Sequence, residues 1–400
     1  MNGLGGRWLP LRDWRMEARG HIAALDGVRG VAVLLVALLH FIPDISLQWR
    51  AAEWFKKLFT TGGWIGVDFF FVLSGFLITD ILLRSKQGPG YFTNFYMRRA
   101  LRIFPLYYGI LLIIFVALPG TGLIQIEPRS FVESQSYHWF YATNFGAWII
   151  GGNPFSTHQF NLLHLWSLSI EEQFYLVWPA VVLLANNRVL VAICVFLCSS
   201  ALLLRCLLCL VGVEDYSAYY LTPCRWDGLA AGALIAILSP TKLQRLCKPA
   251  KIIASACGLF LVVVFFIIRG LWPHHWLMKT AGLSIITTMF ACVLIVILID
   301  RDGALARVAR LRPLIFLGKY SYGIYIIHGA LMPALHQMLP VAPWVGSFGG
   351  WIGFGAFLLA ATKLGICISL AVASFYFYEM PFLRLKRFFT SSVRSKADSD

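Results

Sequence analysis

Charged residues are scarce in this chain, and acidic residues are the scarcest. Of the 400 residues only 13% are charged, whereas 59% are hydrophobic. A soluble domain of this size needs a polar surface that such a composition cannot supply, so a soluble globular protein is excluded. Several apolar stretches instead reach the ~20 residues that a helix needs to cross a bilayer. The composition therefore predicts an all-α polytopic membrane protein.

Three further absences narrow the range of functions that this membrane protein could have. Cys206 and Cys209 form a CxxC spacing without a second pair, so neither zinc nor redox chemistry is indicated and we expect no metal. No small-residue cleavage site follows the first apolar run, which we therefore interpret as an uncleaved span rather than a signal peptide. The two halves of the chain also lack matching Gly- or Pro-broken helices, a feature that many transporters have.

Ten apolar stretches are candidate spans, and the loops between them alternate in charge. The predicted spans are roughly 28–42, 64–83, 102–118, 165–185, 189–211, 224–239, 252–269, 280–299, 313–338 and 350–379. One alternate set of loops, which includes both ends of the chain, holds most of the Lys and Arg residues. By the positive-inside rule we expect both termini in the cytoplasm, which an even number of spans satisfies.

The same distribution accounts for the net charge of +15. It predicts contact with membrane lipids and no binding of nucleic acid, because the basic residues follow the topology. We expect residues 1–20 to be a basic cytoplasmic segment and residues 21–384 to form the membrane domain. Residues 385–400 are predicted to be a disordered basic cytoplasmic tail.

The first apolar run carries an ionisable residue at each end. Arg29 lies eleven positions before His40, which on an α-helix is a rise of about 16 Å and nearly three full turns. The two side chains therefore share one helix face at opposite depths. Ionisable residues inside a span are costly and usually face a protein interior or a wet cavity, so the pair indicates a functional site. The alternative is that Arg29 extends to the lipid headgroups and His40 ends the span.

Three carboxylates are predicted at a depth similar to that of His40. Asp68 lies near the outer end of the second span, and Glu171 and Glu172 lie near the outer end of the fourth. A carboxylate beside an imidazole can orient it, and a glutamate at such a position suits proton transfer. Adjacent helical residues point about 100° apart, so we expect only one of the two glutamates to face a given cavity. A structural ion pair between a glutamate and Arg225 is the alternative.

Three arginines lie on the predicted cytoplasmic side between the second and third spans. Arg98, Arg99 and Arg102 are placed at the start of a helix, whose N-terminus adds positive potential of its own. Such a cluster can bind a polyanionic ligand. It serves equally well as a topology anchor, and composition alone slightly favours that alternative.

Aromatic residues and histidines supply the remaining candidates. Trp166 opens the fourth span, and Tyr322 and His328 lie in the ninth. We assign these three residues to substrate binding, although tyrosines are also common at membrane interfaces. The long outer loop 119–163 is almost uncharged and rich in aromatic and amide side chains. Those side chains suit the binding of sugars, and they suit a membrane interface equally well.

Small residues in two predicted spans indicate close helix packing. Gly75 follows Ser74 in the second span, and we interpret this pair as a packing contact. Gly228 and Gly232 in the sixth span have the small-xxx-small spacing that lets helix backbones approach each other.

Five stretches together resemble the signatures of one family. They are, in order, LDGVRG through His40, GVDFFFVLSGFLIT, RRALRIFPLYY, LWSLSIEEQFYLVWP and LGKYSYGIYIIH. They resemble the membrane acyltransferase-3 family, the O-antigen and exopolysaccharide O-acetyltransferases, over about residues 20–385. Each stretch alone is weak, but five in the same order are specific.

The resemblance implies transfer of an acyl group, usually acetyl from acetyl-CoA, to a hydroxyl of a sugar, a glycolipid or another acceptor, in a bacterial inner membrane. Arg29 and His40 match the family's essential pair. Arg99 and Arg102 match its cytoplasmic arginine motif, which is linked to the acyl-CoA donor, and we group Arg98 with them. Some relatives carry an additional SGNH-type hydrolase domain that this sequence lacks, so we expect the membrane domain or a partner to handle the acceptor.

The leading hypothesis is thus a membrane O-acyltransferase that modifies a polysaccharide. His40 is its general base or a transient acyl carrier, and Arg29, Asp68 and one of Glu171 and Glu172 assist it. The alternative is a multi-span transporter or flippase of a glycolipid or small solute, in which the same residues would form a proton relay.

Overall fold

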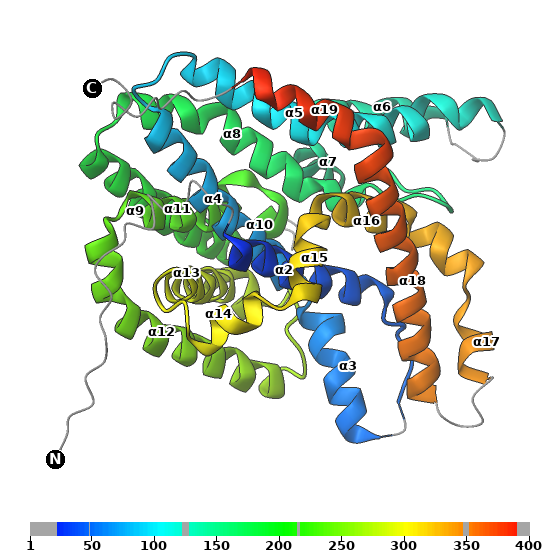
Figure 1. The fold of residues 1–400 in the computed structure, drawn as a ribbon. Coiled ribbons are helices and arrows are strands. Elements are labelled where there is room, and N and C mark those ends of the chain that lie inside the picture. Colours follow the sequence, from blue (N-terminus) through cyan, green and yellow to red (C-terminus); the bar gives the residue numbers. More distant parts are fainter. Residues whose placement is uncertain (1–21, 48, 122–127, 214–216, 347–351, 390–400) are drawn as a thin grey trace.

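The computed structural model describes residues 22–47, 49–121, 128–213, 217–346 and 352–389. Over these residues the chain is helical and forms no strand, apart from one isolated bridge between Ser156 and Asn161. Figure 1 shows the helices gathered in one bundle with α2 (Ala23–Phe41) near its centre. The first predicted span is therefore surrounded by the rest of the chain.

Seven helices of the described part are long and apolar enough to cross a membrane. They are α2, α4 (Ile65–Ser85), α5 with its π-helical end (Tyr91–Ala117), α9 (Asn187–Leu210), α12 (Pro240–Ile267), η4 with α13 (Met278–Ile299) and the segment Ile352–Phe388, which α18 (Ile352–Ser374) begins. They coincide with seven of the ten predicted spans, so the prediction of an all-α polytopic membrane protein is confirmed.

The other three predicted spans fall on shorter or more polar helices. These are α8 (Trp166–Leu184), α11 (Thr222–Ile237) and α16 (Ser321–Met338). The total of ten spans and the cytoplasmic location of both termini remain predictions.

The structure differs from the predicted elements in several loops. The ninth predicted span is two helices, because α15 (Arg312–Lys319) ends before Tyr320 and α16 begins after it. The connection between the first two spans contains a helix that the sequence analysis missed, α3 (Arg50–Gly62). The long outer loop contains two further helices, α6 (Pro128–Trp139) and α7 (Thr143–Ile150).

The two ends of the chain lie largely outside the described residues. The predicted basic segment 1–20 is not among them, and neither is the part of the predicted tail from 390 to 400. Disorder was predicted from residue 385, but Leu385–Phe388 form a short 3₁₀ helix, so the prediction is wrong for these four residues.

Glycines bring α2 into backbone contact with the helices that follow α13. A Cβ atom on Gly27 would lie 1.6 Å from the carbonyl oxygen of Ala309, and one on Gly30 would lie 2.0 Å from that of Leu314. In the opposite direction, a Cβ on Gly318 would lie 1.7 Å from the carbonyl oxygen of Asp26. Only glycine fits at these positions, so the glycines of the LDGVRG stretch determine helix packing.

Helices α4 and α11 cross in the same way. A Cβ on Gly75 would lie 1.9 Å from the carbonyl oxygen of Leu229, and one on Gly232 would lie 1.9 Å from that of Val72. The predicted packing role of Gly75 and of the small-xxx-small spacing is therefore confirmed. Together the glycine contacts fix α2, α4, α11 and α15 relative to the site beside them.

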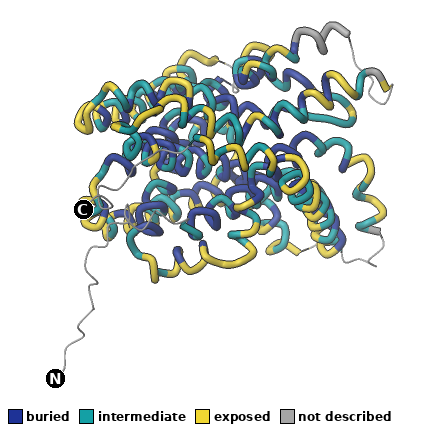
Figure 2. The backbone as a smooth tube through the Cα atoms, turned by 45° about the horizontal axis from the view of Figure 1, so that its top comes forward, coloured by how far each residue is buried: buried dark blue, intermediate teal, exposed yellow. Residues whose placement is uncertain are grey.

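Large apolar side chains cover much of the outer surface of the bundle. Leu184, Phe196 and Phe377 are 85%, 66% and 87% exposed, respectively. Figure 2 shows exposed residues along the outer helices and buried residues toward the middle. Lipid tails are as apolar as these side chains, so this surface is compatible with a bilayer.

Candidate functional site

Two of the cavities in the described part of the bundle are lined in part by α2. Residues Arg29, Arg99, Arg102 and Glu171 line the first, which we call the arginine cavity. His40 lines the second together with aromatic residues, and we call it the histidine cavity. The predicted placement of Arg29 and His40 at opposite ends of one helix face therefore corresponds to two separate cavities.

The arginine cavity gathers guanidinium groups from two helices. Arg99 and Arg102 are three positions apart on α5 and therefore share a face. Arg29 of α2 is held by Asp26, with 2.8 Å between its guanidinium nitrogen and the carboxylate oxygen. These groups give the cavity a strongly positive wall beside the single carboxylate of Glu171.

Arg98 lies elsewhere, contrary to its grouping with Arg99 and Arg102. Its side chain is exposed and donates a hydrogen bond of 3.1 Å to the carbonyl oxygen of Phe389. Adjacent helical residues point about 100° apart, which turns Arg98 away when Arg99 faces the cavity.

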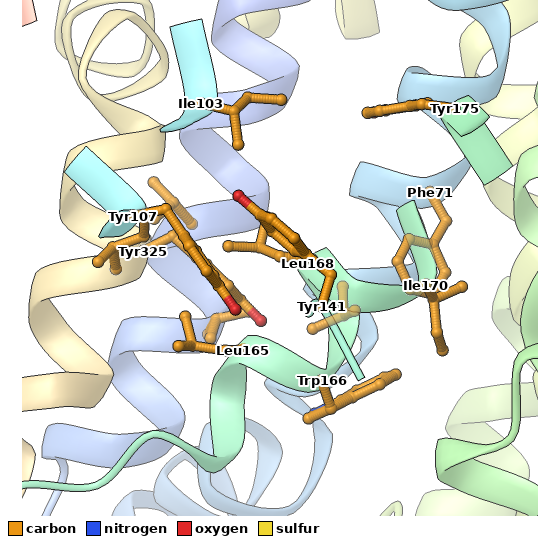
Figure 3. Close-up of a cluster of buried hydrophobic side chains, with 14 of the residues drawn as sticks. Phe71, Ile103, Tyr107, Tyr141, Leu165, Trp166, Leu168, Ile170, Tyr175 and Tyr325 are labelled. Carbon is orange, nitrogen blue, oxygen red and sulfur yellow. The ribbon is translucent and has the colours of Figure 1, made fainter. Parts of the chain in front are cut away.

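Glu171 and Glu172 also separate as predicted, because only Glu171 lines the cavity. Beside it the hydroxyl groups of Ser74 and Tyr175 hydrogen-bond to each other. The guanidinium carbon of Arg99 lies 5.6 Å from the centre of the Tyr175 ring. Figure 3 shows Tyr175 at one side of a group of buried aromatic and aliphatic side chains between α4, α5 and α8.

His40 is held in one tautomer by its own helix. Its Nδ1 atom lies 2.9 Å from the carbonyl oxygen of Val36, one turn earlier. A carbonyl oxygen only accepts hydrogen bonds, so Nδ1 carries the proton, and in the neutral ring Nε2 keeps its lone pair. That arrangement suits Nε2 to accept a proton from a substrate.

Two further histidines stand next to His40. The ring centres of His40 and His328 are 5.2 Å apart, and those of His328 and His164 are 5.6 Å apart. His328 donates through Nδ1 to the carbonyl oxygen of Ile324, and His164 donates through Nε2 to that of Ile326, each at 3.1 Å. All three rings are thus oriented by backbone carbonyls.

The sequence analysis did not select His164 as a site residue. It lies one residue before the LWSLS stretch, which was the only signal available. Its position depends on Gly329 of α16, because a Cβ there would lie 2.3 Å from the His164 ring. The close approach of a ring to a glycine backbone cannot be read from one sequence.

Asp68 has a different partner from the one predicted. Its carboxylate forms a buried ion pair of 3.0 Å with Arg225 of α11. Asp68 shares a face of α4 with Gly75, seven residues later, and this face packs against α11. None of the three predicted carboxylates lines the histidine cavity, so similar depth did not place them at His40.

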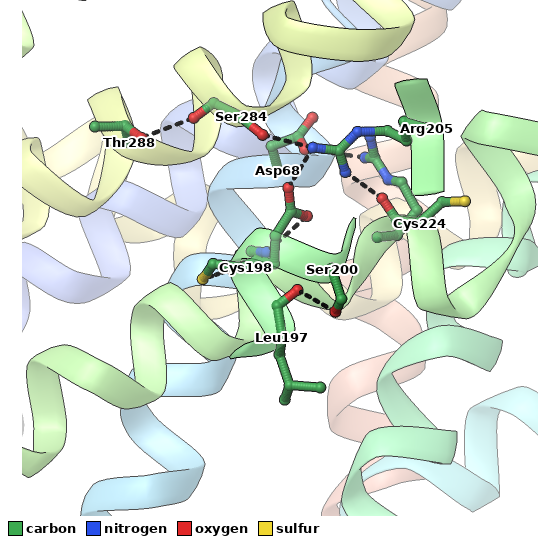
Figure 4. A network of polar contacts seen from close by, with 11 residues as sticks. Asp68, Leu197, Cys198, Ser200, Arg205, Cys224, Ser284 and Thr288 are labelled. Carbon is green, nitrogen blue, oxygen red and sulfur yellow. Dashed lines mark hydrogen bonds and ion pairs between the residues drawn. The ribbon is translucent and has the colours of Figure 1, made fainter. Parts of the chain in front are cut away.

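Arg225 instead connects Asp68 with the wall of the histidine cavity. Its guanidinium carbon lies 5.5 Å from the centre of the Trp166 ring and 5.0 Å from that of Tyr219, and both rings line the cavity. A second buried arginine, Arg205 of α9, donates to Asp227 at 2.8 Å and forms part of the network in Figure 4. The two charged residues of the RWD sequence in α11, Arg225 and Asp227, are thus both in buried ion pairs.

The three residues assigned to substrate binding occupy three different positions. Trp166 lines the histidine cavity, with Trp64, Tyr219 and Tyr220 on the same aromatic wall. Tyr322 lines the arginine cavity and donates its hydroxyl to a backbone carbonyl of α5. His328 lines neither of these cavities, although it contacts His40.

Among the described residues, no group of three or more His, Cys, Asp and Glu side chains is placed to hold a metal ion.

Comparison with known proteins identifies relatives over most of the chain. The chain is 28% identical to the peptidoglycan O-acetyltransferase OatA of Listeria monocytogenes, over 81% of this chain and 51% of the relative. It is 29% identical to the putative peptidoglycan O-acetyltransferase YrhL of Bacillus subtilis, over 94% of this chain and 59% of the relative. A putative O-acetyltransferase of Staphylococcus aureus is 28% identical, over 79% of this chain and 52% of the relative.

The chain thus spans about half the length of the curated relatives it matches. No solved structure matches it. The sequence profile of an acyltransferase domain matches residues 22–373, which include both cavities. The chain therefore belongs to this family of membrane acyltransferases, as the five signature stretches predicted.

Proposed function

We propose that the protein transfers an acetyl group from a cytoplasmic acyl-CoA to a hydroxyl of a cell-envelope glycan, at the bacterial inner membrane. The names of the relatives, which refer to O-acetyl transfer and to peptidoglycan, support the reaction and the class of acceptor. The donor and the roles of individual residues are proposed from the geometry of the site.

The observation that carries the proposal is that the two ends of α2 line two chemically different cavities. One end of this helix contributes Arg29 to a cavity lined by three arginines, and the other end contributes His40 to a cavity lined by aromatic rings. A polyanionic donor and a hydroxylated acceptor call for two such environments. A helix with a purely structural role would not require an arginine-lined cavity at one end and a histidine-lined cavity at the other.

The arginine cavity suits the phosphates of coenzyme A. Arg29, Arg99 and Arg102 offer guanidinium donors whose hydrogen bonds to phosphate are charge-assisted and therefore strong. The thin pantetheine arm would extend from this cavity toward the histidine cavity and carry the thioester with it.

The histidine cavity suits a sugar. Trp64, Trp166 and Tyr219 supply aromatic faces and edges, and Asn161 supplies an amide for hydrogen bonding. The Nε2 atom of His40 accepts the proton of the acceptor hydroxyl as its oxygen attacks the thioester carbonyl carbon. The carbon–sulfur bond then breaks, and the imidazolium returns the proton to the leaving thiolate. An acyl group carried transiently by His40 is the variant of this scheme that a trapping experiment would reveal.

The test is transfer by the purified full chain in lipid vesicles. Acetyl-CoA labelled in the acetyl group is supplied with a panel of glycan fragments, and acetylated products are identified by mass spectrometry. We expect labelled O-acetyl esters with the parent protein and at least about a hundredfold less with His40→Ala. Absence of transfer from acetyl-CoA alongside transfer from another acetyl donor would overturn the assignment of the arginine cavity. Movement of an unmodified glycolipid without acetylation would instead support a flippase.

A further inference from the structure

Two residues line both cavities. Val67 of α4 and Tyr325 of α16 are shared between the arginine cavity and the histidine cavity, and both are buried, with exposed fractions of 5% and 6%. These two side chains therefore stand where the cavities meet. Figure 3 shows Tyr325 within the same buried group of side chains.

Tyr325 is held across this junction by its hydroxyl group. The hydroxyl donates a hydrogen bond of 2.8 Å to the carbonyl oxygen of His164, which lies just before α8. The Ser167 hydroxyl oxygen of α8 lies 2.5 Å from the Tyr325 hydroxyl oxygen, which can accept a hydrogen bond from it. The Tyr325 side chain thus extends from α16 to the start of α8, where hydrogen bonds hold its hydroxyl group.

The Tyr325 ring also touches groups of both cavities. Its centre lies 6.1 Å from that of Phe70, which lines the arginine cavity, and 5.6 Å from that of His164, which lines the histidine cavity. Rotation of the side chain would break its hydroxyl contacts with the His164 carbonyl oxygen and the Ser167 hydroxyl. Val67 has no polar tip and no comparable attachment.

Reacting atoms must approach to about 3–3.5 Å before a bond can form. A thioester in the arginine cavity and a hydroxyl in the histidine cavity are separated by the Tyr325 ring. We propose that Tyr325 is a movable partition: it keeps the two cavities apart at rest, and it must turn aside for the acyl group to reach the acceptor beside His40. This proposal rests on the proposed function for its assignment of donor and acceptor, but the partition itself does not depend on that assignment.

A partition of this kind protects the donor from hydrolysis. In hydrolysis the oxygen of water bonds to the acyl carbon, the carbon–sulfur bond breaks, and carboxylic acid and free thiol are released. With Tyr325 closed, water in the histidine cavity does not reach the thioester. Tyr325 is therefore a positioning residue, and its effect should appear in the ratio of hydrolysis to transfer.

The first experiment measures both reactions with labelled acetyl-CoA in the full-length protein. Tyr325→Ala removes the ring, and we expect the ratio of hydrolysis to transfer to rise about tenfold or more. Tyr325→Phe keeps the ring but loses the hydroxyl attachments, and we expect a smaller rise in the same direction. A purely structural role would lower both reactions together and leave the ratio unchanged, which would overturn the proposal.

The second experiment detects the partition without any substrate. The nine native cysteines are all unpaired and are replaced first. Leu77→Cys then marks the arginine cavity and Met332→Cys the histidine cavity. A charged, membrane-impermeant thiol reagent is added to one side of oriented vesicles. With Tyr325 present, we expect each side to label one marker only, whereas Tyr325→Ala should allow one side to label both.

The two proposals fail in distinguishable ways. Labelling of both markers from one side with Tyr325 intact, or unchanged separation in Tyr325→Ala, would overturn the partition whatever the protein acetylates. If labelling behaves as expected and no acetyl transfer is found, the partition stands and the proposed function falls.

Discussion

At the scale of single residues, a backbone carbonyl orients His40, and no carboxylate of the described residues lines its cavity. Catalytic histidines are often oriented by an aspartate, but here the carbonyl oxygen of Val36 takes that role from within α2. A neutral carbonyl fixes the tautomer without adding a charge to the cavity. The Asp68 carboxylate serves Arg225 instead.

Replacing His40 by alanine should slow the chemical step and spare donor binding. General-base catalysis contributes about 10²–10⁴-fold, so we expect kcat to fall by that factor at every acetyl-CoA concentration. Donor binding, measured separately with a labelled CoA analogue, should be unchanged, because His40 lines the other cavity. Recovery of the full rate at high acetyl-CoA would show that His40 binds the donor.

Arg99→Ala should mainly weaken donor binding. A hydrogen bond to a charged group contributes about 1.5–3 kcal/mol, which corresponds to a rise in KM for acetyl-CoA of roughly tenfold to over a hundredfold. Arg98→Ala is the matched control, since Arg98 is adjacent in sequence but exposed and outside the cavity. Equal effects of the two variants on KM would mean that surface charge, rather than the cavity, attracts the donor.

The sequence predicted the site residues that are polar and lie inside spans. Arg29, His40 and Glu171 line cavities as expected, because an ionisable group in an apolar run is too costly to face lipid and turns toward a polar interior. Tyr325 and His164 were missed, since a tyrosine or histidine near a helix end has a common interfacial role. The partner of Asp68 was missed because depth in the membrane does not determine the direction in which a side chain points.

At the scale of helices, two kinds of contact hold the bundle together. Glycines allow backbone contact between α4 and α11, and buried ion pairs connect α11 to α4 and α9. Lipid cannot replace either contact, because one depends on shape and the other on charge.

Gly75→Ala should destabilise the protein, because its new Cβ would lie 1.9 Å from the Leu229 carbonyl oxygen and force α4 and α11 apart. Overpacking of this kind costs about 1–3 kcal/mol. The measurement is the temperature at which the detergent-solubilised protein loses its fold. Gly258→Ala in α12 is the control, since nothing lies within 4 Å of its Cβ position. A Gly75→Ala protein as stable as the control would contradict the close crossing.

Arg205→Met should be more damaging still. Arg205 is fully buried, and its loss leaves the Asp227 carboxylate without its ion-pair partner, which typically costs about 3–5 kcal/mol. The double variant Arg205→Met with Asp227→Leu should recover much of the lost thermal stability, since it removes both charges. Lys251→Met, which breaks a more exposed pair with Asp300, should change stability little.

At the scale of the whole molecule, hydropathy predicted the class and seven of the spans, because long apolar runs have no other stable arrangement in a membrane. It did not predict α3, whose apolar residues alternate with charged ones, or the break at Tyr320 between α15 and α16. Hydropathy averaged along the chain does not register an amphipathic helix such as α3 or a break at a single residue.

The topology prediction is that both ends of the chain lie in the cytoplasm, since the basic residues cluster in alternate loops. A reporter enzyme that is active only outside the cytoplasm should be inactive when fused after Asp400. The same reporter inserted after Gly152, in the long outer loop, should be active and serves as the control. Activity of the fusion after Asp400 would place the C-terminus outside the cytoplasm and contradict the topology prediction.

The contact between α2 and α15 forms late in biosynthesis, because the two helices are far apart in the sequence. Gly27 and Gly30 enter the membrane among the first residues made, but their partners, Ala309 and Leu314, lie in the last quarter of the chain and leave the ribosome much later. At about 5–20 residues per second, α2 waits for tens of seconds with its glycine groove facing lipid or an insertion chaperone. Until α15 arrives, the arginine end of α2 lacks its final surroundings, and the arginine cavity stays incomplete until α16, which follows α15 and lines the cavity, is made.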